Sequence, residues 1–501
     1  MNNNFKVLLV YPNIPLLGAT PSNLPILSAY LKQNGYDVKL FDCTIYKPKD
    51  IETDDDVRTK LGQAKKTNVY DYFVTKDVDM YEDFVRIVDE YKPNLIGFSI
   101  IDSTLTMTFN FIKKIKHKKI PIITGGVAST FSYEKILNTG LVDYACIGEG
   151  EEALVELCNK LYNHEDCTNI RNIYTKDEDG NIIKNPLRPL IDVNSLPVPD
   201  FSIYEYTRFY KPFFGGVVRT LRIDTDRGCP MVCSYCAAPL LRKMSKDNSA
   251  GGYFRIKDID KVILETKELV KKHEIDFIFM GAESFLSMPL PKLEIFAKKY
   301  VDEINLPFTC QIRIDTFTPE KTKLLSEMGC KSAAVGLEHG SEKIREELLN
   351  KRLSHKKVIE GFIEVSKYDI VPGINNMIGL PDETRENIFE TIELNREIVK
   401  ILRGKLTLNV FTFMPFTGTK LREICLEKGY ITGNEDLPLS WYNRSVLNMP
   451  SLSQDEIAGL EKTFVLYVKL PKSYWPDIKI AEQDNEEGNI MFEKLSKLLS
   501  I

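Results

Sequence analysis

Two successive series of alternating strands and helices constrain the fold of this chain more than any other feature of its sequence. The first series lies in residues 1–165, with apolar strands at 6–11, 37–41, 95–100, 120–124 and 144–147 and helical spacing between them. Parallel βαβ units produce this alternation, so we expect an α/β domain with a doubly wound, Rossmann-like sheet. Ligands of such sheets bind at the carboxyl ends of the strands.

The second series begins after a connector at residues 166–215. Its Leu196-Pro197-Val198-Pro199 segment cannot sustain a helix, and residues 173–184 indicate a hairpin that turns at Asp179-Gly180. Six strand candidates follow, at 220–225, 277–280, 308–314, 332–336, 371–378 and 406–413. Six βα units are too few for a closed barrel, so we expect a partial (β/α)6 barrel at 216–428. A mixed, mainly helical region at 429–501 would help to shape a substrate pocket.

Composition excludes several classes of protein. The net charge of −5 gives no basic excess of the kind that nucleic-acid binding requires. No segment approaches the roughly 18 apolar residues that cross a bilayer. Ten cysteines without a paired pattern in 501 residues are typical of a reducing cytosol. We therefore expect a cytoplasmic protein that binds neither nucleic acid nor membrane.

Three cysteines lie close together at the end of the first predicted barrel strand, in the sequence RGCPMVCSYCAA. Their spacing, Cys-x3-Cys-x2-Cys at Cys229, Cys233 and Cys236, lets one loop wrap one face of a 4Fe-4S cluster. Three thiolates leave one iron free to bind a further ligand directly. A structural zinc site or an unliganded thiol cluster is the alternative, but zinc normally takes four ligands and no fourth Cys or His lies nearby. The spacing favours an iron–sulfur cluster.

This loop resembles the CxxxCxΦC signature of the radical SAM superfamily, with Tyr235 as the aromatic residue. In that family S-adenosylmethionine (SAM) chelates the open iron, and its reduction releases a 5′-deoxyadenosyl radical. The resemblance implies SAM-binding residues at Tyr235, at Gly281, Ala282 and Glu283 (usually Gly-Gly-Glu), at Glu338 in VGLEHG, and at Gly379 and Pro381 in MIGLPDET. Arg313 ends a strand and could face the same cofactor. His339 could serve structure or catalysis, and Trp441 and Tyr442 could wall a pocket or pack in the core.

A doubly wound domain ahead of such a barrel resembles the cobalamin-binding subfamily of these enzymes. The resemblance implies cobalamin contacts at the turns, by Pro12, Asn13, Ser103, Gly125, Gly126, Gly148, Glu149 and Gly150. Glycines there would let the backbone approach a flat macrocycle closely, although ordinary βα turns also use glycine. None of the five histidines precedes His117, so cobalamin would bind base-off without a histidine on cobalt.

The resemblance implies an enzyme with a 4Fe-4S cluster, SAM and cobalamin as cofactors. We expect it to methylate an unactivated carbon or phosphorus of a small metabolite or natural product. An external one-electron reductant such as a flavodoxin or ferredoxin would drive it. Non-methylating radical chemistry (cyclisation, ring contraction or epimerisation) and a non-catalytic iron–sulfur or cobalamin sensor are the alternatives. The sequence identifies neither the substrate nor a further catalytic residue.

Overall fold

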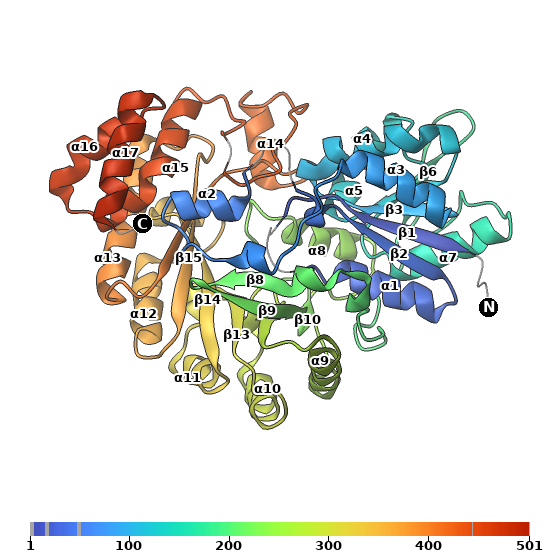
Figure 1. Cartoon of the computed structure of the whole chain (residues 1–501), viewed down its shortest axis with the longest axis horizontal. Coiled ribbons are helices and arrows are strands. Elements are labelled where there is room, and N and C mark those ends of the chain that lie inside the picture. The colour runs from blue at the N-terminus through green and yellow to red at the C-terminus, as the bar shows by residue number, and fades with distance from the viewer. Residues whose placement is uncertain (1–4, 16–19, 48–51, 443, 500–501) are drawn as a thin grey trace.

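Two seven-stranded sheets form the framework of the chain (Figure 1). The computed structural model describes residues 5–15, 20–47, 52–442 and 444–499. The N-terminal sheet has the order β2-β1-β3-β4-β5-β6-β7, and the barrel sheet has the order β16-β15-β14-β13-β12-β9-β8. These sheets confirm the α/β fold class, with a Rossmann-like domain ahead of a partial barrel. Within the described ranges, no helix has the length and apolar character needed to cross a membrane.

The N-terminal sheet has five parallel strands with helices on both faces. The strands are β1 (Lys6–Tyr11), β2 (Asp37–Asp42), β3 (Leu95–Ser99), β4 (Ile122–Gly125) and β5 (Tyr144–Cys146). The helices are α1 (Asn23–Gln33), α3 (Met80–Tyr91), α4 (Leu105–Ile115), α5 (Val127–Phe131), α6 (Tyr133–Asn138) and α7 (Glu151–Tyr162). Along β1, Val7 and Leu9 pack in one core, while Leu8 and Val10 pack in the other. Burial on both faces explains the unbroken apolar run of this strand.

The hairpin that the sequence predicts in the connector extends the N-terminal sheet. Strands β6 (Ile173–Lys176) and β7 (Ile182–Lys184) are antiparallel, and β6 pairs with β5. The hairpin therefore covers the edge of β5, whose backbone groups would otherwise be open to pairing.

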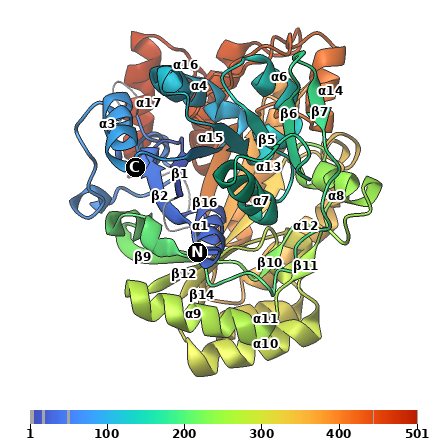
Figure 2. The ribbon, with the colours of Figure 1, turned by 90° about the vertical axis from the view of Figure 1, so that its right-hand side faces the viewer.

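The barrel sheet contains six parallel strands, as the sequence predicts. They are β9 (Gly216–Ile223), β12 (Phe277–Met280), β13 (Phe308–Ile312), β14 (Cys330–Glu338), β15 (Val371–Ile378) and β16 (Thr407–Thr412). The helices are α9 (Ile259–His273), α10 (Leu290–Glu303), α11 (Pro319–Glu327), α12 (His355–Val365) and α13 (Arg385–Ile401). Figure 2 shows α9, α10 and α11 on the outer side of this sheet. The short strand β8 (Tyr210–Phe213) pairs antiparallel with β9.

A segment of the N-terminal domain closes the open side of the barrel, which the sequence did not predict. Helix α2 (Asp54–Lys60) leaves the N-terminal sheet and lies above the barrel strands in Figure 1. Beyond α2, Gln63 Oε1 accepts hydrogen bonds from the Val410 N–H of β16 and from the Tyr442 hydroxyl, both at 3.1 Å. Arg58 donates to Asn409 Oδ1 at 3.0 Å. These bonds cap the edge strand β16 and make α2 part of the barrel wall.

The C-terminal region is mainly helical. Its helices are α14 (Lys420–Glu427), α15 (Gln454–Lys469), α16 (Trp475–Ala481) and α17 (Glu486–Leu498). Helix α15 packs between β16 and α13, and its Ile457, Leu460 and Phe464 are buried in the barrel core. The region therefore completes the barrel on the same side as α2.

Candidate functional site

The loop that carries the three cysteines contributes to two cavities. The interdomain cavity, of about 330 Å³, lies between the carboxyl edge of the N-terminal sheet and the barrel, and Gly228 lines it. The barrel cavity, of about 840 Å³, lies inside the barrel, and Tyr235 and Cys236 line it. A group held by this loop would therefore be accessible from both cavities.

The cysteine loop follows the short strand β10 (Asp226–Arg227), which pairs with β11 (Arg255–Ile256), and leads into α8 (Ala238–Asp247). Gly228 starts the loop with φ of +91°, and a Cβ there would lie 2.3 Å from the Tyr253 carbonyl oxygen. Only glycine fits this approach. The Ser234 N–H donates to the Leu349 carbonyl at 3.0 Å and fixes the loop to the barrel.

The three loop cysteines differ from the others in exposure. Cys229 and Cys233 are half-buried and Cys236 is exposed, whereas the other seven cysteines are buried. Burial of its thiol, together with charge on Cys233, Glu283 and Cys229, raises the pKa of Cys236 to about 11. The thiols are thus close enough to act on one another. In the described part of the chain, no three His, Cys, Asp or Glu side chains already have the geometry of a metal site, so cluster ligation by these cysteines stays a prediction.

Tyr235 and Glu338, two of the predicted SAM-binding residues, meet at the wall of the barrel cavity. The Tyr235 hydroxyl donates to Glu338 Oε1 at 2.9 Å, and Lys351 Nζ donates to the same oxygen at 2.8 Å. Glu338 has φ of +68°, a conformation that L-residues rarely adopt. Strained residues of this kind cluster at functional sites, so the conformation supports a role for Glu338 in binding.

The predicted Gly281-Ala282-Glu283 motif follows β12 and lies on the barrel side of the interdomain cavity. Gly281 and Glu283 line this cavity, while Ala282 is buried in the barrel core. A Cβ at Gly281 would lie 2.1 Å from Asp224 Oδ1, so any side chain here would have to displace the ion pair of Arg222 and Asp224. Burial raises the pKa of the Glu283 carboxyl, against the opposing charge of Arg222.

Three further predicted SAM-binding residues line neither cavity. Arg313 pairs with Asp315 at 2.8 and 2.9 Å and donates to the Lys351 carbonyl at 2.8 Å. Gly379, with φ of +78°, and Pro381 lie in the loop after β15. Their involvement with SAM stays a prediction.

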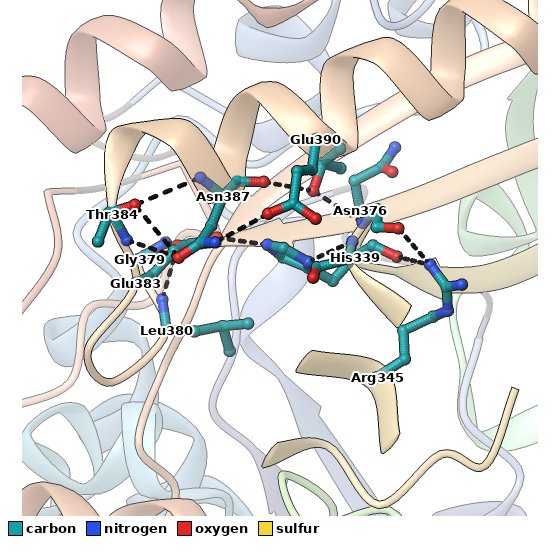
Figure 3. A network of polar contacts seen from close by, with 12 residues as sticks. His339, Arg345, Asn376, Gly379, Leu380, Glu383, Thr384, Asn387 and Glu390 are labelled. Carbon is teal, nitrogen blue, oxygen red and sulfur yellow. Dashed lines mark hydrogen bonds and ion pairs between the residues drawn. The ribbon is translucent and has the colours of Figure 1, made fainter. Parts of the chain in front are cut away.

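A buried polar network joins that loop to the end of β14 (Figure 3). Glu383 accepts hydrogen bonds from the backbone N–H groups of Gly379 and Leu380, the latter at 3.0 Å, and contacts His339 Nε2 at 2.8 Å. The Ser341 N–H donates to His339 Nδ1 at 2.9 Å, so the ring proton lies on Nε2 and points to Glu383. His339 therefore positions the loop next to Glu338, and the structure gives it a hydrogen-bonding role.

We expect Glu383→Gln to destabilise the protein by about 2–4 kcal/mol, because all three partners of this carboxylate are N–H donors and the amide must turn its N–H₂ group toward His339 or the backbone donors. Thermal unfolding of the two proteins measures the difference, and the KM for SAM should rise more than kcat falls. Glu390→Gln is the control. Its carboxylate accepts from Asn387 Nδ2 at 2.9 Å at an exposed site, so a change below about 0.5 kcal/mol is expected there. Equal stability of the two variants would contradict a positioning role for Glu383.

The interdomain cavity receives five of the eight predicted cobalamin-binding residues. Those five are Gly125, Gly126, Gly148, Glu149 and Gly150. Pro12, Asn13 and Ser103 do not line it, and the Asn13 side chain donates to the Tyr11 hydroxyl at 2.8 Å and accepts from the Ile14 N–H at 2.8 Å. Among the lining residues that sequence reasoning missed are Ser22, Asn23, Leu24, Gly97, Ser99, Thr124 and Cys146. A glycine inside a strand, as at Gly97 in β3, is the signal that could have revealed them.

The inner end of the interdomain cavity is an apolar slot between the sheet and helices α1 and α7. Leu9, Leu24, Leu27, Ile123 and Leu154 line it. Gly97 and Gly125 add no side chain to the sheet face, and a Cβ at Gly125 would meet only Cys146 Cβ, at 3.9 Å. Such a slot fits a flat apolar group, as the nucleotide base of cobalamin would present. No histidine is found among the described residues that line this cavity.

An ion-pair network closes one side of the interdomain cavity and joins the two domains. Glu149 pairs with Arg227 at 3.1 Å and with Arg255 at 3.2 Å, and Glu151 pairs with Arg227 at 2.7 Å. Although burial opposes it, the hydrogen bond from Arg255 and the charge of Arg227 lower the pKa of the Glu149 carboxyl. The Glu149 carboxylate is therefore held by Arg227, two residues before Cys229, and by Arg255. This leaves the backbone at Glu149 to contact a ligand.

The fold and site are those of a radical SAM barrel joined to a B12-binding domain, and two family models match accordingly. The model of the radical SAM superfamily matches residues 224–394, and the model of the B12 binding domain matches residues 18–158. The chain belongs to the radical SAM superfamily, in the group of enzymes that carry a cobalamin-binding domain.

Three known proteins illustrate the similarity. An uncharacterized methyltransferase, PH0819 of Pyrococcus horikoshii, is 24% identical over 79% of this chain and 83% of its own length. Cytidylyl-2-hydroxyethylphosphonate methyltransferase of Streptomyces wedmorensis is 22% identical over 92% of this chain and 89% of its own. The solved structure of OxsB, a cobalamin-dependent S-adenosylmethionine radical enzyme with aqua-cobalamin and S-adenosylmethionine bound, has a TM-score of 0.64 at 15% identity and covers 98% of this chain and 70% of its own. At this identity OxsB shows a shared fold.

Proposed function

We propose that this chain is a cobalamin-dependent radical SAM methyltransferase that acts on an unactivated carbon or phosphorus of a small molecule. One observation carries the proposal: the cysteine loop contributes to both the interdomain cavity of the B12-binding domain and the barrel cavity. One group on this loop can therefore serve both a corrin and a substrate. Similarity to two methyltransferases along most of the chain supports methyl transfer over other radical chemistry.

The residues take distinct roles in this proposal. Cys229, Cys233 and Cys236 hold the cluster, and Tyr235 and Glu338 orient SAM at the wall of the barrel cavity. The Gly281–Glu283 backbone turn contacts SAM from the side of the interdomain cavity. The apolar slot next to Gly97 and Gly125 holds the nucleotide base of cobalamin.

When bound, the cluster would pass one electron to SAM, which would split into methionine and a 5′-deoxyadenosyl radical, and cobalamin would carry the methyl group. Overall, the substrate would exchange a hydrogen atom for a methyl group, and two SAM molecules would be consumed, one as radical source and one as methyl donor that leaves S-adenosylhomocysteine. Helix α2 and the Trp441-Tyr442 segment wall the barrel cavity and limit access of water to the radical. The electrons come from an external one-electron donor of the flavodoxin or ferredoxin class.

Methyl-labelled SAM tests the proposal without knowledge of the substrate. The protein is purified anaerobically, its cluster is reconstituted, and it is incubated with cobalamin, a one-electron reductant and the labelled SAM. The proposal predicts label on the corrin that stays with the desalted protein, together with S-adenosylhomocysteine in solution. Release of 5′-deoxyadenosine and methionine with no label on the corrin would instead indicate cyclisation, ring contraction or epimerisation.

A further inference from the structure

The barrel cavity has a polar corner that the roles assigned above leave unused. Lys211 on β8 and Thr220 on β9 both line this cavity. Their orientation follows from the register: Lys211 pairs with Val218, which also lines the cavity, and Thr220 is two residues further along the same strand. The two side chains therefore belong to the inward face of the β8–β9 pair.

Both groups lack polar partners although they are buried. Lys211 is 6% exposed and Thr220 is 6% exposed, and neither Lys211 Nζ nor Thr220 Oγ1 has a hydrogen-bond partner in the described part of the chain. The Lys211 amine lies 5.9 Å from the centre of the Phe73 ring. Burial, with added repulsion from Arg208, lowers the pKa of Lys211 well below its ordinary value. An ammonium group in such a place needs an anion to stay charged.

The nearby carboxylates do not supply that anion. Asp42 pairs with Arg208 at 2.8 Å, so its charge is already matched. Asp55 lines the same cavity and its charge acts on Lys211, but the two side chains do not form an ion pair within 4.0 Å. Burial raises the pKa of both Asp54 and Asp55, while the charge of Arg58 opposes the shift at each of them. Lys211 Nζ is therefore a donor without a matching anion, and Arg58 Nε, on the same cavity, also has no hydrogen-bond partner in the described part of the chain.

The barrel cavity also has a large aromatic wall. Its aromatic residues include Phe213, Phe277, Phe279, Phe411, Phe416 and Trp441. Phe411 and Phe416 pack edge-on against Trp441, with ring centres 6.2 and 5.6 Å apart. Such walls bind flat or extended apolar groups, while a few polar groups fix the orientation of the ligand.

We infer that the barrel cavity takes an organic acid, whose aromatic or otherwise apolar body packs on these rings and whose oxyanion is held by Lys211 and Thr220. The inference rests on the proposed function, because it treats the barrel cavity as the substrate chamber. A neutral substrate would leave the amine without a charged partner, and a cationic one would be repelled by it whenever the amine is charged.

Matched pairs of probes test the inference: naphthalene-2-acetate against naphthalene-2-acetamide, and 4-phenylbutyrate against 4-phenylbutyramide. Binding to the anaerobic, cluster-reconstituted full-length protein with SAM present is measured by calorimetry. In the wild type each acid should bind about tenfold or more tightly than its amide, since a charge-assisted bond replaces a neutral one. An amide that binds as tightly as its acid, or no binding by either pair, would overturn the inference.

Three variants test whether Lys211 causes the preference for acids over amides. Lys211→Met keeps the apolar stem and removes an unmatched buried amine, so it should fold normally and lose the preference for acids. Lys211→Arg should retain the preference, and Lys331→Met, at an exposed position on β14, should match the wild type. A preference that persists in Lys211→Met would contradict the assignment. Production of 5′-deoxyadenosine is followed in all variants: if the wild type does not cleave SAM, the proposed function fails, whereas the acid-to-amide ratio tests the inference separately.

Discussion

Serine at Cys229, Cys233 or Cys236 is expected to abolish SAM cleavage, lowering the rate of 5′-deoxyadenosine release by more than about a thousandfold. A cluster held by three local thiolates has no substitute ligand, because the other seven cysteines are buried elsewhere in the fold. The visible absorption of the reconstituted cluster should be lost together with the activity. Chromatographic detection of 5′-deoxyadenosine under anaerobic conditions measures the effect.

Cys167→Ser is the matched control for these substitutions. Its thiol donates to the Glu165 carbonyl at 3.5 Å, a bond that a serine hydroxyl can also make, and it lies away from both cavities. This variant should keep its cluster and its rate. A Cys233→Ser protein with the full rate of SAM cleavage would contradict the assignment of the cluster to this loop.

Leucine at Gly125 is expected to weaken the affinity for cobalamin by about a hundredfold or more, while SAM cleavage persists. The new Cβ would meet only Cys146 Cβ at 3.9 Å, so the side chain enters the interdomain cavity instead of clashing with the backbone. A side chain of this size occupies the slot that the nucleotide base requires. Retention of the corrin after desalting, read from its visible absorption, measures the loss.

Gly216→Leu is the control for the size change. Gly216 is exposed at the start of β9, and its nearest neighbour to a new Cβ is the Phe213 carbonyl oxygen at 3.5 Å. This variant should bind cobalamin as the wild type does. Full corrin binding by Gly125→Leu would show that the interdomain cavity is not the corrin site.

Features that depend on local spacing were predictable from the sequence. The alternation of strands and helices defined both sheets, because burial on both faces leaves an unbroken apolar run such as that of β1. The cysteine loop was visible because its three cysteines lie within eight residues of one another. The turns at Gly125 and Gly148 were placed near the cavity because carboxyl ends of parallel strands share one edge.

Features that depend on distant segments meeting were not predictable. In the sequence, helix α2 comes between two strands of the N-terminal domain, yet in the fold Arg58 contacts Asn409 in the barrel. In the sequence, nothing distinguishes Lys211 from other lysines. Only the register of β8 on β9 shows that its side chain faces the barrel interior. Gly340 is another example: a Cβ there would lie 2.3 Å from the Glu390 carbonyl oxygen, a contact that only the packing of α13 creates.

The retention of cobalamin by the wild-type protein tests the central claim most directly. The protein is purified anaerobically, its cluster is reconstituted, cobalamin is added, and the visible spectrum is recorded after desalting. The account predicts one corrin per chain, with the base-off spectrum that a site without a histidine ligand gives. A protein with an intact cluster that cleaves SAM but retains no corrin would contradict it, and would leave the N-terminal domain as a scaffold for non-methylating chemistry.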